Sequence, residues 1–286
     1  MNTPAPSAGR AASGATAGSP ATTTAAAAAA SAETGSPPFL ALQRATVRFA
    51  GGGLPVWDGL SLSVSRGESL CLLGASGCGK STVLRVMAGL QPLASGEMLT
   101  AVRSPAFVFQ EPALLPWADL ERNVGLPLQL AGWTAAATNE RVQAVLKRVG
   151  LTGRERALPH ELSGGMKMRA SIARALVMQP DLLLMDEPFS ALDDPTRQRL
   201  QADLLQWWQV QGFALCFVTH QVAEAVFMAS RVVVMGAKGG QIVAEWEVDE
   251  PFPRTDAFRR SARFHEHCVA IGDALAGNTG STWDRR

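Results

Sequence analysis

Residues 74 to 82 read Gly74-Ala75-Ser76-Gly77-Cys78-Gly79-Lys80-Ser81-Thr82. They follow the apolar run 70–73 and precede a helical stretch over 80–89. A strand, a loop of the pattern Gly, four residues, Gly-Lys-Ser, and a helix in this order are typical of a phosphate-binding loop. Its glycines let backbone N–H groups face phosphate oxygens, and the helix adds the positive end of its dipole. A glycine-rich turn without a ligand is the alternative, which this context disfavours.

The polar side chains that end this loop have expected roles towards a nucleotide. Lys80 reaches the β- and γ-phosphates, Ser81 places its hydroxyl on Mg²⁺, and Thr82 supports the α-phosphate side. The loop therefore predicts a site for a magnesium-bound nucleotide.

Two acids follow a second apolar run, where 182–185 leads into Asp186, Glu187 and Pro188. Such a run is typical of a strand buried on both faces of a parallel sheet. Its carboxyl end lies at the sheet edge where ligands of open α/β folds bind. We expect Asp186 to hold Mg²⁺ through its water shell and Glu187 to orient and polarise an attacking water. A helix-capping acid pair before a turn is the alternative.

A second glycine-rich segment reads Leu162-Ser163-Gly164-Gly165-Met166. Ser163 can cap a helix expected over 166–176. The unpaired N–H groups and the dipole at this helix start would favour a phosphate, and Gly164 and Gly165 would permit its close approach.

These motifs resemble those of the nucleotide-binding subunits of ABC transporters, over about residues 40 to 250. The segment 162–166 is similar to the family signature, whose fifth residue is commonly Gln rather than Met. Further matches are Asp186-Glu187 to the second nucleotide motif, Ser190-Ala191-Leu192-Asp193 to the dimer-contact loop, Gln110 to the hinge glutamine and His220 to the switch histidine.

The resemblance implies an ATPase that uses ATP and Mg²⁺ and works as a head-to-tail homodimer. The nucleotide held by one subunit would contact the signature of the other, together with the dimer-contact loop: Ser163, Gly164, Gly165, Met166 and Asp193. Four residues would act in hydrolysis: Lys80, Gln110, Glu187 and His220. Three would hold the metal: Ser81, Gln110 and Asp186.

His220 also has a context of its own, because it follows the apolar run 213–219. We expect that run to be a parallel strand, which places His220 at the ligand-binding edge, where its ring can donate to a phosphate oxygen. A satisfied core histidine is the alternative. His265 and His267 make a poor metal pair, since residues at i and i+2 face apart on a helix.

The adenine contact is less defined, because the family usually stacks the base on an aromatic residue, often Tyr, and this chain contains no Tyr. Phe49 lies about thirty positions before Lys80 and can offer a π face. Trp57 competes for this role, and a core role for either residue stays open.

The fold expected is α/β: a P-loop NTPase core with a mostly parallel sheet flanked by helices. Alternating residues over 45–49 and 60–64 predict an N-terminal antiparallel β subdomain, and an inserted helical subdomain over about 111–178 carries the signature. We expect the ATPase domain over 38–250 and a partly helical C-terminal tail over 251–286. Residues 1–37, nearly all Ala, Thr, Ser, Gly and Pro, are expected to be a disordered low-complexity tail.

Composition sets further limits. The formal net charge of +1 gives no electrostatic case for nucleic acid binding. The four cysteines form no C-x-x-C pair, which suits reduced thiols in the cytosol. No apolar run approaches the roughly 20 residues that span a bilayer, so a membrane path would belong to another polypeptide.

The segment 111–117 places leucines and Trp117 on a proline-bounded loop after Gln110, and clustered apolar residues there suggest a partner contact.

The sequences of 109–117 and of 164–169 resemble those of the nitrate, sulfonate and taurine importers within the family. This implies membrane permease subunits, an extracytoplasmic substrate-binding protein and a peripheral location on the cytoplasmic face of the membrane. Sulfonate, taurine, nitrate, bicarbonate and a pyrimidine vitamin precursor stay open as substrates. The alternative is a non-transport ABC ATPase that acts as a mechanical or regulatory clamp with a membrane partner.

Overall fold

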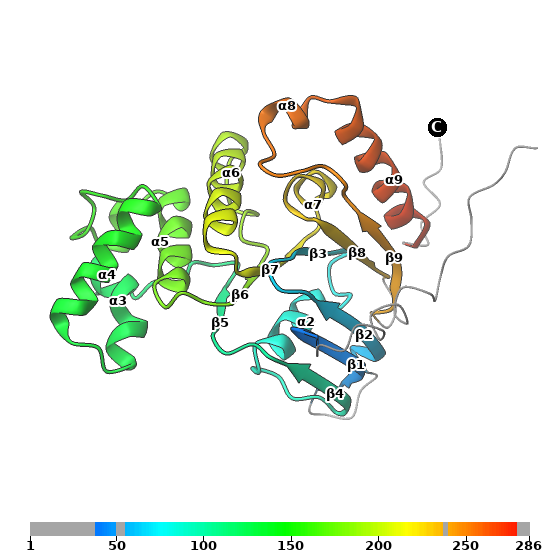
Figure 1. Cartoon of the computed structure of the whole chain (residues 1–286), viewed down its shortest axis with the longest axis horizontal. Coiled ribbons are helices and arrows are strands. Elements are labelled where there is room, and N and C mark those ends of the chain that lie inside the picture. The colour runs from blue at the N-terminus through cyan, green and yellow to red at the C-terminus, as the bar shows by residue number, and fades with distance from the viewer. Residues whose placement is uncertain (1–37, 50–54, 237–239, 279–286) are drawn as a thin grey trace, which may run out of the picture. The chain divides into compact units, whose positions relative to one another are not determined.

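The phosphate-loop sequence joins a buried strand to a helix, as predicted. The computed structural model describes residues 38–49, 55–236 and 240–278, so the expected disordered tail over 1–37 lies outside the described residues. Strand β3 (Ser69–Gly74) is buried along its whole length, and helix α2 (Lys80–Met87) begins directly after the loop. Figure 1 shows this unit at the centre of the described part of the chain.

In the described residues, a six-stranded sheet has the order β5-β6-β7-β3-β8-β9 and contains β3 as an inner strand. Neighbours from β5 to β8 pair in parallel, and β9 is antiparallel to β8. This confirms the predicted mostly parallel sheet. The remaining strands are β5 (Pro105–Val108), β6 (Leu182–Asp186), β7 (Ala214–Thr219), β8 (Arg231–Met235) and β9 (Ile242–Glu247).

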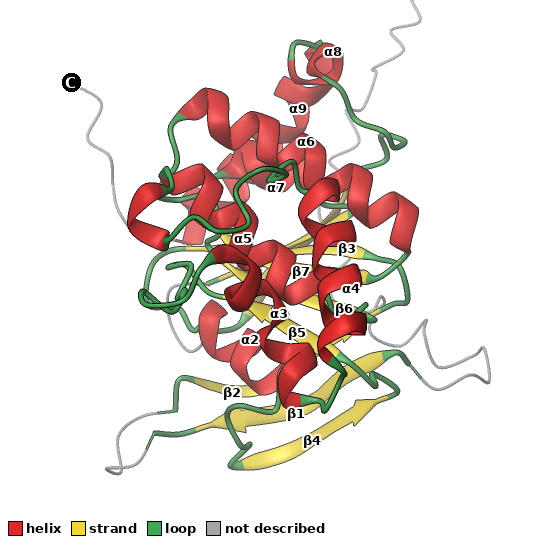
Figure 2. Cartoon of the chain, turned by 90° about the vertical axis from the view of Figure 1, so that its left-hand side faces the viewer, coloured by secondary structure: helices red, strands yellow, loops and turns green. Residues whose placement is uncertain are grey.

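A second sheet, with the order β2-β1-β4 among the described strands, is antiparallel. The predicted segments 45–49 and 60–64 fall within or at the end of its strands β1 (Leu40–Val47) and β2 (Trp57–Val64), while β4 (Ser95–Thr100) was not predicted. Helix α2 lies between the two sheets, as Figure 2 shows. Its Val83, Leu84 and Met87 share one buried cluster with residues of both.

The two faces of the six-stranded sheet contact different layers. Leu70 and Leu72 of β3 belong to the cluster with α2 and the antiparallel sheet, whereas Cys71 and Leu73 belong to the cluster on the opposite face. Side chains of a strand alternate between faces, so a strand that is covered on both sides must be apolar throughout. This is the physical reason for the continuous apolar runs in the sequence.

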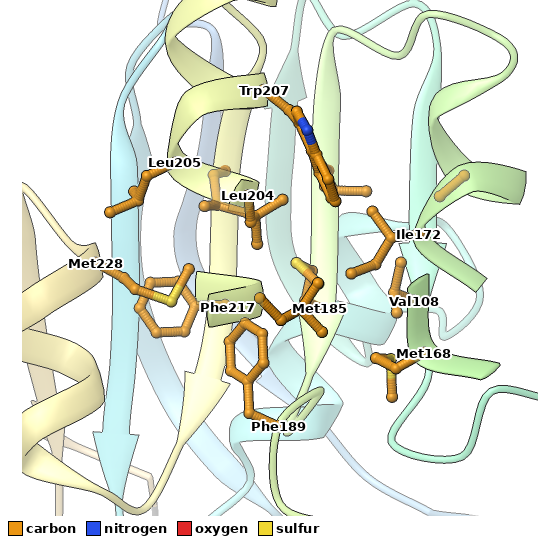
Figure 3. Packing of buried hydrophobic residues seen from close by; sticks show 14 of the residues in the cluster. Val108, Met168, Ile172, Met185, Phe189, Leu204, Leu205, Trp207, Phe217 and Met228 are labelled. Carbon is orange, nitrogen blue, oxygen red and sulfur yellow. The ribbon is translucent and has the colours of Figure 1, made fainter. Parts of the chain in front are cut away.

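The opposite face packs on the helices that follow the motifs, α5 (Gly164–Leu176), α6 (Asp194–Gln211) and α7 (Val222–Met228). Figure 3 shows Met185 and Phe217 of the sheet meeting Ile172 of α5 and Leu204 of α6. Phe189, directly after β6, is fully buried in the same cluster. The Phe189 side chain therefore anchors the loop after Asp186 and Glu187 to the core.

The predicted helical subdomain is formed by α3 (Leu120–Leu130), α4 (Ala135–Arg148), the short 3-10 helix η1 (Pro159–Glu161) and α5. Apolar residues at helical spacing form the buried face of α4, where Val142, Val145 and Leu146 are buried. Among the helices in the described part of the chain, each is too short or too polar to cross a membrane.

The C-terminal segment contains α8 (Asp256–Arg259) and α9 (Ala262–Asn278), which agrees with its predicted helical content. It belongs to the same compact unit as the residues before 250, and α9 packs on α7, β8 and β9. The boundary predicted at residue 250 therefore falls inside a continuously packed region.

Arg254 anchors this segment. It is buried, and its guanidinium donates to the carbonyls that end α7 and to two carbonyls beyond β9: Val226, Phe227, Ala229, Val248 and Glu250. Burial lowers the pKa of Arg254 to about 10, so the side chain stays protonated at neutral pH. One cation thus satisfies the unpaired carbonyls of a helix end and of the chain that leads into α8.

We expect Arg254→Ala to lower the free energy of unfolding by about 2–4 kcal/mol, because several buried carbonyls lose their donor. Urea unfolding followed by circular dichroism measures the change. Arg263→Ala is the matched control, since the Arg263 side chain is 47% exposed and pairs with Asp249 at the surface, a contact worth at most about 1 kcal/mol. Equal losses in the two variants would contradict the anchoring role of Arg254.

Candidate active site

The phosphate loop adopts a backbone that requires glycine at position 79. Gly79 has φ of 99°, and a Cβ atom there would lie 2.8 Å from Cδ1 of Trp57 and 2.9 Å from Cγ1 of Val56. Gly77 also has a positive φ, of 82°. The loop therefore lies directly on the buried Trp57 ring, with its exposed side facing away from the core.

Lys80 is buried, and its ammonium group lies beneath the loop. Its Nζ donates to the carbonyls of Gly74 and Ala75, both at 2.8 Å. The Cys78 Sγ is 4.0 Å from the same nitrogen. An ammonium has three donors, so two of them are directed at the loop's own backbone in this structure.

A cleft of about 460 Å³ opens over the loop. One part of its wall is apolar and comes from Phe49, Pro55 and Val56, and Glu187 lies in the lining as well. The remaining wall is the phosphate loop and the start of α2: Ser76, Gly77, Gly79, Lys80, Ser81 and Thr82. The cleft thus joins an aromatic surface, a row of loop residues and a carboxylate.

The two aromatic candidates for the adenine contact, Phe49 and Trp57, differ clearly in their exposure. Phe49 is 55% exposed and lines the cleft, whereas Trp57 is fully buried beneath the loop. Trp57 therefore offers no ring face to a ligand, and its role is to support the loop. Of the two, Phe49 is the residue that the structure places beside the cleft.

Ser81 and Asp186 meet although they lie far apart in the sequence. The Ser81 Oγ donates to the Asp186 Oδ1 at 2.7 Å. Asp186 is the last residue of β6 and is 8% exposed, so its carboxylate is held rigidly against the start of α2. A hydroxyl and a carboxylate are both oxygen ligands of the kind that Mg²⁺ prefers.

Glu187 and His220 are in direct contact. The His220 Nδ1 lies 3.1 Å from the Glu187 Oε2, which links the ends of β6 and β7. A hydrogen bond between these two atoms requires a single proton, carried by either the ring nitrogen or the carboxyl oxygen. Glu187 has φ of 43°, in the left-handed region, which is strained for a residue with a side chain. Such strain is common at functional sites, and Glu187 is part of the cleft lining.

Gln110 lies outside the cleft lining. Its Nε2 donates to the Ser190 Oγ at 3.4 Å, and Ser190 in turn donates to the Glu187 carbonyl at 2.9 Å. Gln110 follows the edge strand β5, one strand away from β6. It therefore reaches Glu187 through Ser190 rather than through the cleft.

The second glycine-rich segment starts a helix, as predicted, but two residues earlier. Ser163 caps α5 by accepting a hydrogen bond from the Met166 N–H at 3.3 Å. Gly165 is required for packing within the chain, since a Cβ atom there would lie 2.5 Å from the Thr196 Cγ2 of α6. Ser163 and Gly164 are exposed, and Met166 packs partly against the core. None of residues 163–166 is part of the cleft lining.

Asp193 is the N-cap of α6 and also lies outside the cleft lining. Its carboxylate accepts from the Thr196 N–H at 3.4 Å. Hydrogen bonds from Thr196 lower the pKa of Asp193 below its usual value, so the residue is ionised at neutral pH.

Sequence reasoning missed a polar network behind His220. Glu224 of α7 is buried, and it accepts a hydrogen bond from the Thr219 Oγ1 at 2.6 Å. Arg197 of α6 lies 3.5 Å from the other oxygen of the same carboxylate. The signal available in the sequence was an acid four residues after the histidine, in the first turn of the helix that follows it.

Comparison with known proteins agrees with this geometry. Residues 57–190 match the family model described as ABC transporter. The chain is 46% identical over 212 residues to an aliphatic sulfonates import ATP-binding protein of Pseudomonas fluorescens, covering 74% of this chain and 78% of that protein. It belongs to the ABC transporter family of ATP-binding subunits. The resemblance inferred from the motifs is thereby confirmed.

Other relatives of this ABC ATPase show the same pattern. An aliphatic sulfonates import ATP-binding protein of a Mycobacterium species is 46% identical over 209 residues, which covers 73% of this chain and 84% of the relative. A dimeric ATP-binding cassette, MJ0796, solved in a post-hydrolysis state with ADP and Pi, superposes with a TM-score of 0.66. It is 26% identical, and the match covers 74% of this chain and all of that one. The chain is thus an ATPase with the predicted P-loop fold.

We expect Gly79→Ala to raise the Kd for ATP by about 10-fold or more, because a Cβ atom would push the loop off Trp57 and strain its backbone. Titration with a fluorescent ATP analogue measures the affinity. Gly272→Ala is the control, since a Cβ atom there meets open space on α9. Unchanged affinity in a folded Gly79→Ala protein would show that the close contact does not shape the nucleotide site.

Proposed function

We propose that this ABC ATPase energises the import of an aliphatic sulfonate or a similar small anion, as a homodimer bound to two membrane permease subunits. The observation that carries the proposal is the incompleteness of the site within one chain. The cleft contains the phosphate loop and Glu187, whereas the exposed, Ser163-capped start of α5 is absent from its lining. A nucleotide therefore needs a second chain to reach that helix start.

The residues of the cleft fit ATP. The loop offers glycine backbone at the positions where phosphates must approach closely, and the exposed Phe49 offers a ring face for adenine. Lys80 would exchange its two loop carbonyls for phosphate oxygens as it takes up the β- and γ-phosphates. Thr82 lines the same cleft and would support the α-phosphate side.

The Ser81–Asp186 pair fits Mg²⁺. Among the described residues, no group of three or more His, Cys, Asp and Glu is placed to hold a metal by itself. Mg²⁺ commonly takes one or two protein oxygens and completes its shell with phosphates and water. Ser81, Asp186 and, after a shift of its loop, Gln110 would supply the protein oxygens, and the ion would neutralise phosphate charge when it is bound.

Glu187 and His220 would carry the hydrolytic step. The Glu187 carboxylate would orient and polarise the attacking water, and the His220 ring would donate to a γ-phosphate oxygen. Glu187 lines the cleft, and the 3.1 Å contact holds the His220 ring, itself outside the lining, next to it. The His220 side chain is 48% exposed, so its ring can turn towards a phosphate without leaving a packed core.

The signature segment and the dimer-contact loop would complete the site of the partner chain. Ser163, Gly164, Gly165 and Met166 would present the start of α5 to the partner's γ-phosphate. Asp193 starts α6 one turn before the Thr196 methyl that packs on Gly165, so the two contact segments are braced against each other. The solved dimeric cassette that resembles this chain supports the proposed pairing.

The loop 111–117 is built as a docking surface for the permease. Asn123 is fully buried and exchanges hydrogen bonds with both the N–H and the carbonyl of Leu115. Arg174 donates to the carbonyls of Pro112 and Ala113. The backbone is therefore held by two helices, while the Trp117 side chain is 75% exposed. Such a fixed, exposed tryptophan is a strong anchor for a partner.

The names of the relatives support the substrate class, since two of them are aliphatic sulfonate import proteins. The importer would also need an extracytoplasmic substrate-binding protein that delivers the solute to the permease. The ATPase subunit would then lie on the cytoplasmic face of the membrane and be held there through the permease.

We expect Glu187→Gln to lower kcat for ATP hydrolysis by about 100-fold or more, since the amide is a far weaker base than the carboxylate. ATP binding would persist, and the variant would accumulate as an ATP-bound dimer in size-exclusion chromatography. Glu140→Gln, on the exposed face of α4, is the control and should hydrolyse ATP at the wild-type rate. Wild-type turnover by Glu187→Gln would remove Glu187 from the proposed mechanism.

We expect Trp117→Ala to leave ATP binding intact but to reduce uptake of a labelled aliphatic sulfonate by at least about 10-fold, as loss of a central anchor commonly costs 2 kcal/mol or more. Uptake is measured in cells whose own copy is replaced by the variant. Trp133→Ala, another exposed tryptophan, provides the control. Uptake at the wild-type level would contradict docking through this loop, and absence of sulfonate uptake by the wild type would favour a different substrate or a non-transport role.

A further inference from the structure

Arg197, in the first turns of α6, contacts two segments of the site at once. Its Nη2 donates to the Leu192 carbonyl at 2.7 Å, and its Nε donates to the Phe189 carbonyl at 3.3 Å. Both carbonyls belong to the loop that connects Glu187 to the dimer-contact residue Asp193. The guanidinium thus bridges the two sides of this loop's backbone.

The same guanidinium reaches the turn that carries His220. Its Nη1 donates to the Gln221 Oε1 at 3.3 Å, and its Nε lies 3.5 Å from the Glu224 Oε1. Nη1 also donates to the Asp194 Oδ1 at 2.7 Å. Arg197 is therefore shared between the loop after β6 and the turn after β7.

Glu224 holds that turn from the other side. It is 5% exposed and accepts from the Thr219 Oγ1, which in turn accepts from the Gln221 N–H at 3.0 Å. His220 lies between these two bonded residues. Burial raises the pKa of Glu224 above its usual value, while Thr219 and Arg197 act in the opposite direction. Within the described residues, the Glu224 Oε1 has no hydrogen bond, so the Arg197 charge is its nearest compensation.

An ion pair between a buried carboxylate and a half-buried guanidinium is a poor way to gain stability, because desolvation offsets their attraction. It is an effective way to fix geometry, because a guanidinium fork bonds several acceptors in one plane. Arg197 bonds the carbonyls of Phe189 and Leu192 and the side chain of Gln221, and its charge faces the carboxylate of Glu224. These contacts link the dimer-contact loop to the turn that carries His220.

We propose that Arg197 and Glu224 are positioning residues that couple the dimer-contact loop to His220, so that contact with the second chain sets the histidine for hydrolysis. The inference rests on the proposed dimer and on the proposed role of His220. It assigns neither residue to the bound nucleotide, since the contacts of both are with the loop after β6 and the turn after β7.

The test uses the full chain and the variants Arg197→Lys, Arg197→Ala and Glu224→Gln. We expect Arg197→Ala and Glu224→Gln to lower kcat by about 10- to 100-fold, as loss of supporting contacts commonly does, with the Kd for ATP changed less than about 2-fold. Arg197→Lys keeps the charge but loses the fork, so its kcat should lie between those of Arg197→Ala and the wild type. Arg199→Ala, exposed on the same helix, is the control.

Two further measurements separate coupling from a loss of structure. The double variant Arg197→Ala/Glu224→Gln should have a kcat no lower than that of the slower single variant. Both substitutions interrupt the same coupling, so their effects should not add. In the Glu187→Gln background, Arg197→Lys should still form the ATP-bound dimer, since the inference concerns what the dimer transmits and not its formation.

Several outcomes would overturn the inference. Wild-type kcat in Arg197→Lys and Glu224→Gln would show that no coupling passes through the pair. Parallel loss of melting temperature and of ATP binding in all variants would show a purely structural role, as would additive effects in the double variant. Failure of the proposed function is distinguishable, because Glu187→Gln would then turn over like the wild type.

Discussion

The parallel register of β3, β6 and β7 is the constraint on which the site depends. Leu73 lies opposite Thr219, and Asp186 lies opposite Val218, so the three strands end together at one edge of the sheet. The phosphate loop, Glu187 and His220 each follow directly from those ends. A shift of one residue in either pairing would turn every side chain of a strand to the other face. Close packing opposes that shift, because each face of the sheet buries its own set of side chains against a different layer. The packing that stabilises the sheet therefore also aligns the residues of the site.

Two arginines, the buried Arg254 and the half-buried Arg197, extend this alignment to segments without regular structure. Arg254 bonds the carbonyls that end α7, and Arg197 bonds carbonyls of the loop after β6. Backbone carbonyls in such places need donors, and apolar packing cannot supply them. A guanidinium satisfies several at once, because its five N–H groups project in one plane. The core therefore fixes the strands, while the arginines fix the turns between them.

Much of the site could be predicted from the sequence because its motifs are local. The phosphate loop, the acids after β6 and the histidine after β7 each carry their own strand, turn or helix signal in adjacent residues. The reason for Gly165 could not be predicted, since Thr196 meets it only in the folded chain. The contact of Gln110 with Ser190 and the burial of Glu224 likewise depend on how separate elements pack. The strand β4 was missed because most of its residues are exposed, which leaves a weak apolar pattern.

The arrangement also explains why one chain separates its two phosphate-binding features. A helix start with unpaired N–H groups attracts an anion wherever it is exposed. Placed in the same cleft as the phosphate loop, the start of α5 would strengthen nucleotide binding to a single chain and leave nothing for a second chain to add. Placed outside it, on an element braced by Thr196 against α6, the helix start would contribute only in the dimer that we propose, where two chains meet around the nucleotide. In that proposed dimer, binding free energy would be available for closing the two chains, and hydrolysis, which removes the shared phosphate, would release them.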